Sequence, residues 1–92
     1  MTLTEEFTEI ANRLRPAFDN VLQEGTSEWG FVVVKDARRM VEIFKTPDGK
    51  WHMDFWQLGF KAHHHPAWET TVDTMDDVVS AVTEWLKRAW MG

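Results

Sequence analysis

Cysteine is absent from the 92-residue chain, and this absence removes two kinds of chemistry. No disulfide can staple the fold, and no thiolate is available as a nucleophile or metal ligand. Small secreted domains often depend on disulfides, so the sequence favours a cytoplasmic location. The acidic N-terminal segment Met1–Glu9 has no apolar core, and we expect no signal peptide there.

Long apolar runs are also lacking, and no stretch approaches the roughly 18 apolar residues of a membrane span. The five glycines are scattered along the chain, so the sequence predicts no phosphate-cradling loop. Serine occurs only at Ser27 and Ser80, which leaves few candidates for a catalytic nucleophile. We therefore expect no membrane insertion and no enzymatic activity.

Basic charge is too sparse to indicate a nucleic-acid-binding protein. The net charge is −5, and residues 35–61, with six basic and four acidic groups, carry only +2. Nucleic-acid-binding surfaces usually concentrate Lys and Arg on one face. We expect no nucleic-acid partner, and the acidic excess is of the size that ordinary solubility explains.

Apolar and aromatic residues are plentiful, with six Trp and six Phe, and they indicate a single folded domain over residues 1–92. Three runs rich in Val, Ile, Phe and Trp are typical of β-strands: Trp29–Lys35, Arg38–Lys45 and Trp51–Leu58. Trp68–Val72 is a candidate fourth strand at a sheet edge. The sequence therefore predicts an antiparallel meander of three or four strands.

The segment Thr46–Lys50 predicts the register of the second and third of these strands. Pro47 suits the first corner of a type I turn, and Gly49 suits the left-handed position that forms a bulge. With Gly49 as the extra residue, the apolar side chains of both strands share one face of the sheet. The pairs that this register predicts are Ile43 with Met53 and Val41 with Phe55.

Two segments with helical apolar spacing flank the strands. The first begins after Thr4 as N-cap, and its apolar residues stay in phase to Leu22, with Gly25 as terminator. Pro16 interrupts this segment, where we expect a kink. The second opens with the Thr74–Asp77 capping box. The predicted fold class is α+β: helix, three- or four-stranded antiparallel meander, helix, with both helices packed on the sheet.

Histidine is the most conspicuous candidate for site chemistry. The run His63–His65 lacks the four ligands at motif spacing that structural zinc sites normally use. On the third predicted strand His52 and Asp54 alternate and share a face with Glu42. A cross-strand ion pair is the simplest role for these residues, and acid–base chemistry is the second candidate role. We predict no metal ligands and no cofactor, and we expect zinc or nickel to stabilise the protein little.

The tryptophans indicate which surface binds a partner. The predicted register puts Trp56 on the face opposite the apolar one, in an aromatic cluster with a charged rim, which resembles an interface. The alternative is that one helix covers each face and buries this cluster. The residues predicted to bind a partner are Met40, Phe44, His52, Trp56 and Trp68.

The sequence thus predicts a small non-enzymatic protein-binding module that acts as an inhibitor, an immunity protein or a chaperone-like adaptor. Its partner is another protein or a second copy of itself. Two alternatives remain: a small-ligand or metal-binding domain that uses His52 or the His63–His65 loop, and a small enzyme with an unfamiliar site. Helix–meander–helix layouts occur in secretion-chaperone-like proteins, immunity proteins and phage-encoded inhibitors, but this analogy of fold does not decide function.

Overall fold

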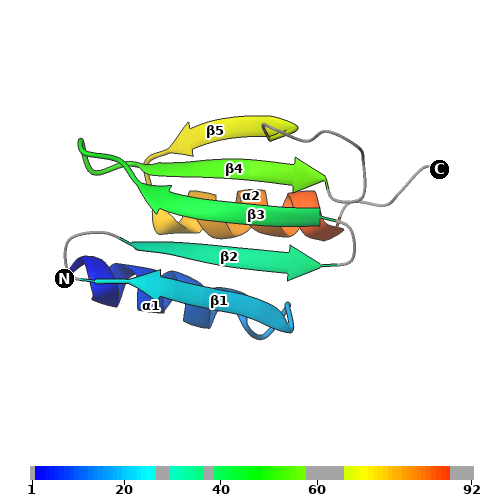
Figure 1. Cartoon of the computed structure of the whole chain (residues 1–92), viewed down its shortest axis with the longest axis horizontal. Coiled ribbons are helices and arrows are strands. Elements are labelled where there is room, and N and C mark those ends of the chain that lie inside the picture. Colours follow the sequence, from blue (N-terminus) through cyan, green and yellow to red (C-terminus); the bar gives the residue numbers. More distant parts are fainter. Residues whose placement is uncertain (1, 27–29, 37–38, 58–65, 88–92) are drawn as a thin grey trace.

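The computed structural model describes residues 2–26, 30–36, 39–57 and 66–87, which form two helices and a five-stranded antiparallel sheet. The sheet order follows the sequence, so each strand pairs with its neighbours in the chain (Figure 1). The elements are α1 (Leu3–Leu14), β1 (Asn20–Gly25), β2 (Gly30–Asp36), β3 (Arg39–Lys45), β4 (Trp51–Gln57), β5 (Trp68–Val72) and α2 (Met75–Lys87). The α+β class with an antiparallel meander is confirmed, but the sheet has five strands where three or four were predicted.

The first helix is shorter than predicted. The additional strand of the sheet is β1, which forms from the C-terminal end of the segment predicted to be helical. α1 begins after Thr2, not Thr4, and the Thr2 hydroxyl accepts a hydrogen bond from the Glu5 N–H at 3.2 Å. The helix ends at Leu14, because Pro16 has no N–H to continue the backbone ladder and its ring clashes with the preceding turn. Pro16 therefore ends the helix instead of kinking it, and residues 20–25 pair with β2.

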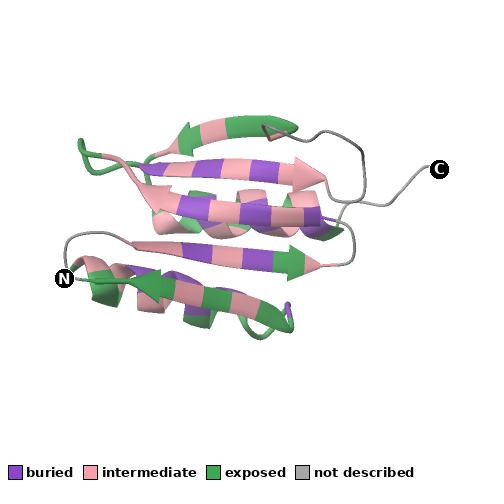
Figure 2. Ribbon diagram, in the orientation of Figure 1, coloured by how far each residue is buried: buried purple, intermediate pink, exposed green. Residues whose placement is uncertain are grey.

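Both helices cover the same face of the sheet, α1 over β1 and β2 and α2 over β2 to β4 (Figure 1). We call this covered face the inner face and the opposite one the outer face. Buried residues alternate with more exposed ones along β2, β3 and β4 (Figure 2), as a sheet covered on one side requires. The buried apolar core consists of Phe7, Ile10, Ala11, Leu14, Phe18, Val32, Val34, Val41, Ile43, Trp51, Met53, Phe55, Val78, Val82 and Leu86.

The second helix begins as the sequence predicted. The Thr74 hydroxyl accepts a hydrogen bond from the Asp77 N–H at 3.1 Å, and Lys87 lies in the last turn, where its charge complements the helix dipole. Residues 88–92 lie outside the described residues. Neither helix in the described part of the chain has both the length and the apolar character that crossing a membrane requires.

The turn between β3 and β4 has the predicted bulged form. Gly49 adopts φ +86°, its N–H donates to the Thr46 carbonyl at 3.0 Å, and the Thr46 N–H donates to the Lys50 carbonyl at 2.9 Å. The Thr46 hydroxyl also donates to the Asp48 carboxylate, which lowers the pKa of that group. The predicted pairs Ile43 with Met53 and Val41 with Phe55 are confirmed.

Gly49→Val should lower the free energy of unfolding by about 1–2 kcal/mol, because a β-branched residue adopts the left-handed conformation poorly. A Cβ atom built on Gly49 meets no atom within 4 Å, so the loss reflects backbone conformation and not a clash. Gly49→Asn is the matched control, since Asn tolerates this conformation, and it should lose less. Urea unfolding compares the two variants, and a Val variant as stable as the parent would contradict the bulged turn.

Candidate functional site

The outer face combines apolar side chains over β1 to β4 with a row of carboxylates over β3 to β5. The registers align side chains in rows across the strands. The middle row consists of Leu22, Val33, Glu42, Asp54 and Glu69. The row on one side of it consists of Glu24, Phe31, Phe44, His52 and Thr71. The row on the other side consists of Asn20, Lys35, Met40 and Trp56. We define the apolar patch as Leu22, Phe31, Val33, Met40, Phe44 and Trp56, and the histidine cluster as His52, Asp54, Glu69 and Thr71.

The apolar patch is only partly shielded from water. Leu22 is 54% exposed, and the other five residues are of intermediate burial. Phe31 and Phe44 lie side by side with ring centroids 6.1 Å apart, and Met40 pairs directly with Trp56. Apolar side chains that group on one face and stay partly exposed are a common feature of binding sites.

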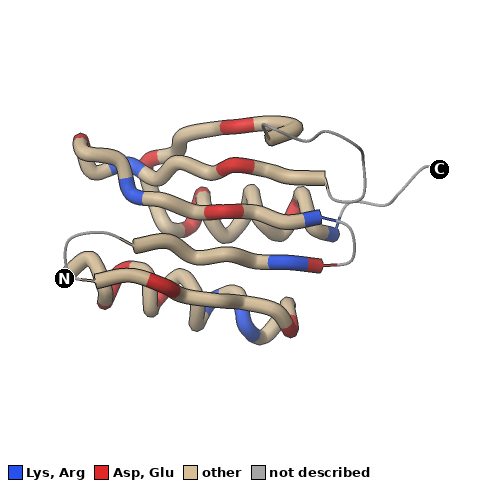
Figure 3. The backbone as a smooth tube through the Cα atoms, viewed as in Figure 1, with Lys and Arg blue, Asp and Glu red and all other residues tan. Residues whose placement is uncertain are grey.

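Glu42 lies within the apolar patch, between Met40 and Phe44 along β3 and opposite Val33 of β2. In the part of the chain that the structure describes, Glu42 has no ion-pair or hydrogen-bond partner for its carboxylate. Its neighbour on β4 is Asp54, and the acidic positions of β3, β4 and β5 line up across the sheet (Figure 3). Like charges opposite one another destabilise a sheet, so a cation beside Glu42 would relieve its repulsion with Asp54.

His52 has polar partners at both ring nitrogens. Its Nε2 lies 2.8 Å from Asp54 Oδ1 and 3.2 Å from Glu69 Oε1. Its Nδ1 lies 3.1 Å from the Thr71 hydroxyl. One ligand atom from each of His52, Asp54 and Glu69 lies within 4.8 Å of the others, so these three residues could hold a metal ion.

Sequence reasoning placed His52, Asp54 and Glu42 on one face, which is correct, but it missed Glu69 and Thr71. Both missed residues come from β5, which pairs antiparallel with β4. The segment between these strands includes residues 58–65, so no short turn signalled which β5 residues face outward. The alternation of Glu69 and Thr71 was the only signal in the sequence.

Four of the five predicted partner-binding residues lie together on the outer face: Met40, Phe44, His52 and Trp56. Trp68 does not join them. It pairs with Phe55 and stacks on it with ring centroids 4.6 Å apart, on the inner side at the sheet edge beside Trp85 of α2. At 51% exposure Trp68 is accessible, but strand parity separates it from the apolar patch.

The sequence left open whether both helices pack on one face of the sheet or one helix covers each face, and the placement of the helices decides this. The alternative that one helix covers each face is wrong, because α1 and α2 contact each other and share the inner face (Figure 1). The run His63–His65 and Trp29 lie outside the described residues, so the predictions made for them stay predictions.

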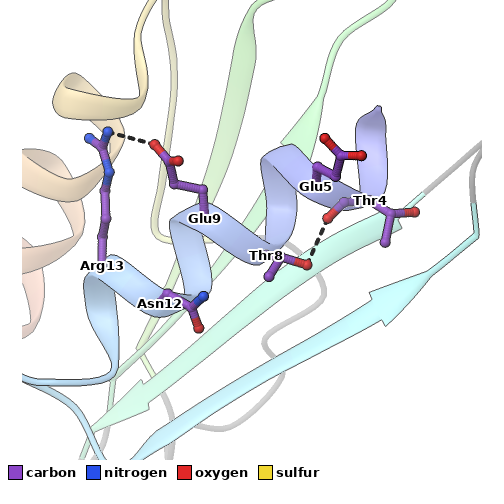
Figure 4. A pocket seen from close by; sticks show the side chains of 6 residues that line it. All are labelled: Thr4, Glu5, Thr8, Glu9, Asn12 and Arg13. Atoms are coloured by element: carbon purple, nitrogen blue, oxygen red, sulfur yellow. Dashed lines mark hydrogen bonds and ion pairs between the residues drawn. The ribbon is translucent and has the colours of Figure 1, made fainter. Parts of the chain in front are cut away.

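A shallow hollow on the solvent side of α1 is lined by Thr4, Glu5, Thr8, Glu9, Asn12 and Arg13 (Figure 4). Its polar groups already contact one another: the Thr8 hydroxyl donates to the Thr4 carbonyl at 2.8 Å, and Arg13 lies 2.7 Å from Glu9 (Figure 4). Arg13 also binds Asp76 at 2.6 Å, and these two carboxylates, Asp76 foremost, raise the pKa of Arg13. A hollow along a single helix with its groups paired locally is a weaker candidate than the outer face.

Comparisons of the chain with models of protein families, with curated proteins and with solved structures found no match.

Proposed function

We propose that the protein binds another protein through its outer face, with the apolar patch as the main contact and Glu42 as the anchor for a basic side chain. The observation that carries this proposal is the packing of both helices on the inner face, so that neither helix lies over the partly exposed apolar patch. An inhibitor, an immunity protein or an adaptor would each work by such binding. The lack of cysteine favours a cytosolic setting.

The shape of the outer face suits a macromolecule better than a small ligand. Small molecules usually bind in concave pockets that bury most of their surface. The described part of the outer face offers a sheet surface and a shallow hollow beside Leu22, Val33 and Lys35. Large aromatic side chains such as Trp56 and Phe44 typically supply most of the binding energy of protein interfaces.

Charge favours a partner with basic groups over a second copy of the chain. Among the described residues, the outer face carries the carboxylates of Glu24, Glu42, Asp54 and Glu69, the ammonium group of Lys35 and the imidazole of His52. Two copies packed face to face would bring both sets of carboxylates into one interface. Burying a carboxylate without a cationic partner costs several kcal/mol. A segment with Lys or Arg between apolar residues supplies the missing cation.

The proposal can be tested with randomised peptides displayed on phage and selected against the purified protein. We expect the enriched peptides to combine aromatic or aliphatic residues with Lys or Arg and to compete with one another for one surface. Enriched peptides without basic residues would refute the role of Glu42. Sedimentation velocity of the protein alone tests self-association, and a dimer that Trp56→Ala dissociates would replace the basic partner with a second copy.

Trp56→Ala should weaken binding of the selected peptides by about 2 kcal/mol or more, because large aromatic residues dominate such interfaces. Its effect on the free energy of unfolding should be smaller, since the side chain is only partly buried in the free protein. Trp68→Ala is the matched control, the same substitution on the other face, and should leave peptide affinity unchanged. Fluorescence titration measures affinity and urea unfolding measures stability. Equal affinity losses in both variants would contradict binding at the outer face.

A further inference from the structure

We propose that His52, Asp54 and Glu69 form a site for one divalent transition-metal ion, with the Nε2 atom of His52 and one oxygen of each carboxylate as ligands. Such a site lies beside the apolar patch and does not depend on the binding of a protein partner. It replaces, for these three residues, the sequence-based prediction that the chain has no metal ligands. The pairing of β4 with β5 supplies the ligand that the sequence did not reveal.

The separations within the cluster are close to those of a metal coordination shell. Zinc binds imidazole nitrogen and carboxylate oxygen at about 2.0–2.2 Å, so tetrahedral ligands lie roughly 3.3 Å from one another. The His52 Nε2 atom is 2.8 Å from Asp54 Oδ1 and 3.2 Å from Glu69 Oε1. The ligand oxygens of Asp54 and Glu69 lie within 4.8 Å of each other, so all three ligand atoms can approach one ion.

The second nitrogen of His52 has the partner that a metal-binding histidine normally has. Metal-ligating imidazoles usually give the N–H of their other nitrogen to an oxygen, which fixes the tautomer and the ring orientation. Here Nδ1 lies 3.1 Å from the Thr71 hydroxyl, which leaves Nε2 to bind the ion. Thr71 is therefore a positioning residue for the site.

The backbone holds the ligands in a fixed relation. His52 pairs with Thr71 and Asp54 pairs with Glu69 across β4 and β5, so all four side chains stand on the outer face. Ligands on paired strands keep a more constant geometry than ligands on loops. The doubly charged ion would also offset the repulsion between the carboxylates of Asp54, Glu69 and Glu42, which follow one another across the sheet.

The composition of the cluster indicates the class of ion. One imidazole and two carboxylates suit zinc, manganese, iron or cobalt better than copper(I), which prefers sulfur ligands. Three protein ligands leave a fourth position for water, as in catalytic zinc sites, or for a side chain of a bound protein. The competing explanation is that a protonated His52 alone bridges the two carboxylates, and it predicts no metal binding.

Isothermal titration of the full chain with Zn²⁺ tests the proposal, together with the absorption spectrum of the Co²⁺ form. We expect one site per chain with a dissociation constant in the micromolar range, and a visible Co²⁺ spectrum of low coordination number. His52→Asn and Glu69→Gln should each weaken binding about 100-fold or more, and Thr71→Val about 10-fold. Circular dichroism confirms that each variant is folded.

The run His63–His65 is the necessary control, since adjacent histidines bind zinc by themselves. A variant with all three replaced by Asn should keep the Zn²⁺ affinity and the Co²⁺ spectrum of the parent. Loss of binding in this variant, with binding retained in His52→Asn, would overturn the proposal. So would the absence of any Zn²⁺ binding below about millimolar concentration, which would support the protonated His52 bridge. Failure of the peptide selection has no bearing on either outcome.

Discussion

Phe7→Ala is expected to lower the free energy of unfolding by about 3–5 kcal/mol, the range for removing a fully buried aromatic side chain. Phe7 is 1% exposed and joins α1 to the inner face of the sheet. Its ring meets the indole of Trp51 edge to face, with centroids 5.4 Å apart and planes at 84°. The ring also lies over Gly30, where an added Cβ atom would come within 3.1 Å of it. The ring of Phe7 therefore packs closely against the sheet, and its replacement by Ala would leave a cavity.

Phe44→Ala is the matched control for this loss. Phe44 lies in the apolar patch of the outer face, where it is of intermediate burial. The same substitution there removes fewer contacts and leaves a surface notch instead of an internal cavity, so the loss should be about 1–2 kcal/mol. Urea unfolding of both variants measures the difference. Equal losses would mean that the outer face is covered as well as the inner one, and the proposed binding surface would be wrong.

The turn and the strands beside it were predictable because their chemistry is local. Pro47 and Gly49 occupy positions where few other residues fit, and they determine which side chains of β3 and β4 share a face. From this register alone, Met40, Phe44, His52 and Trp56 follow as outer-face residues. The cap at Thr74 was predictable for the same reason, since Asp77 lies within one helical turn.

β1 was not predictable in the same way, because its residues satisfy two periodicities. Phe18, Val21 and Leu22 continue the apolar stripe of α1 at helical spacing. In the structure Phe18 is buried after the helix has ended, and Leu22 stands on the outer face, 54% exposed. The pairing with β2 determines that these residues form a strand and not a helix, and this is a tertiary contact that no local pattern reveals.

Glu42→Gln is expected to have opposite effects on stability and on binding. The free protein should gain about 0.5 kcal/mol, because the variant removes the repulsion between Glu42 and Asp54, which lie directly opposite across β3 and β4. Binding of the selected basic peptides should weaken by about 2–3 kcal/mol, which is 30- to 150-fold, because a desolvated basic group of the peptide loses its counter-charge. Glu42 is not among the ligands proposed for the metal ion, so zinc affinity should change little.

Glu24→Gln is the control that separates a central charge from a peripheral one. Glu24 lies on the edge strand β1 and is exposed, so water screens its carboxylate. The same loss of charge there should change peptide affinity by less than about 0.5 kcal/mol and stability hardly at all. If both variants weaken binding equally, the net charge of the face attracts the peptides without a specific anchor. If Glu42→Gln instead destabilises the free protein, the Glu42 carboxylate stabilises the fold. It would then not be an unpaired group available to bind a basic side chain of a partner, and its proposed role as an anchor would be wrong.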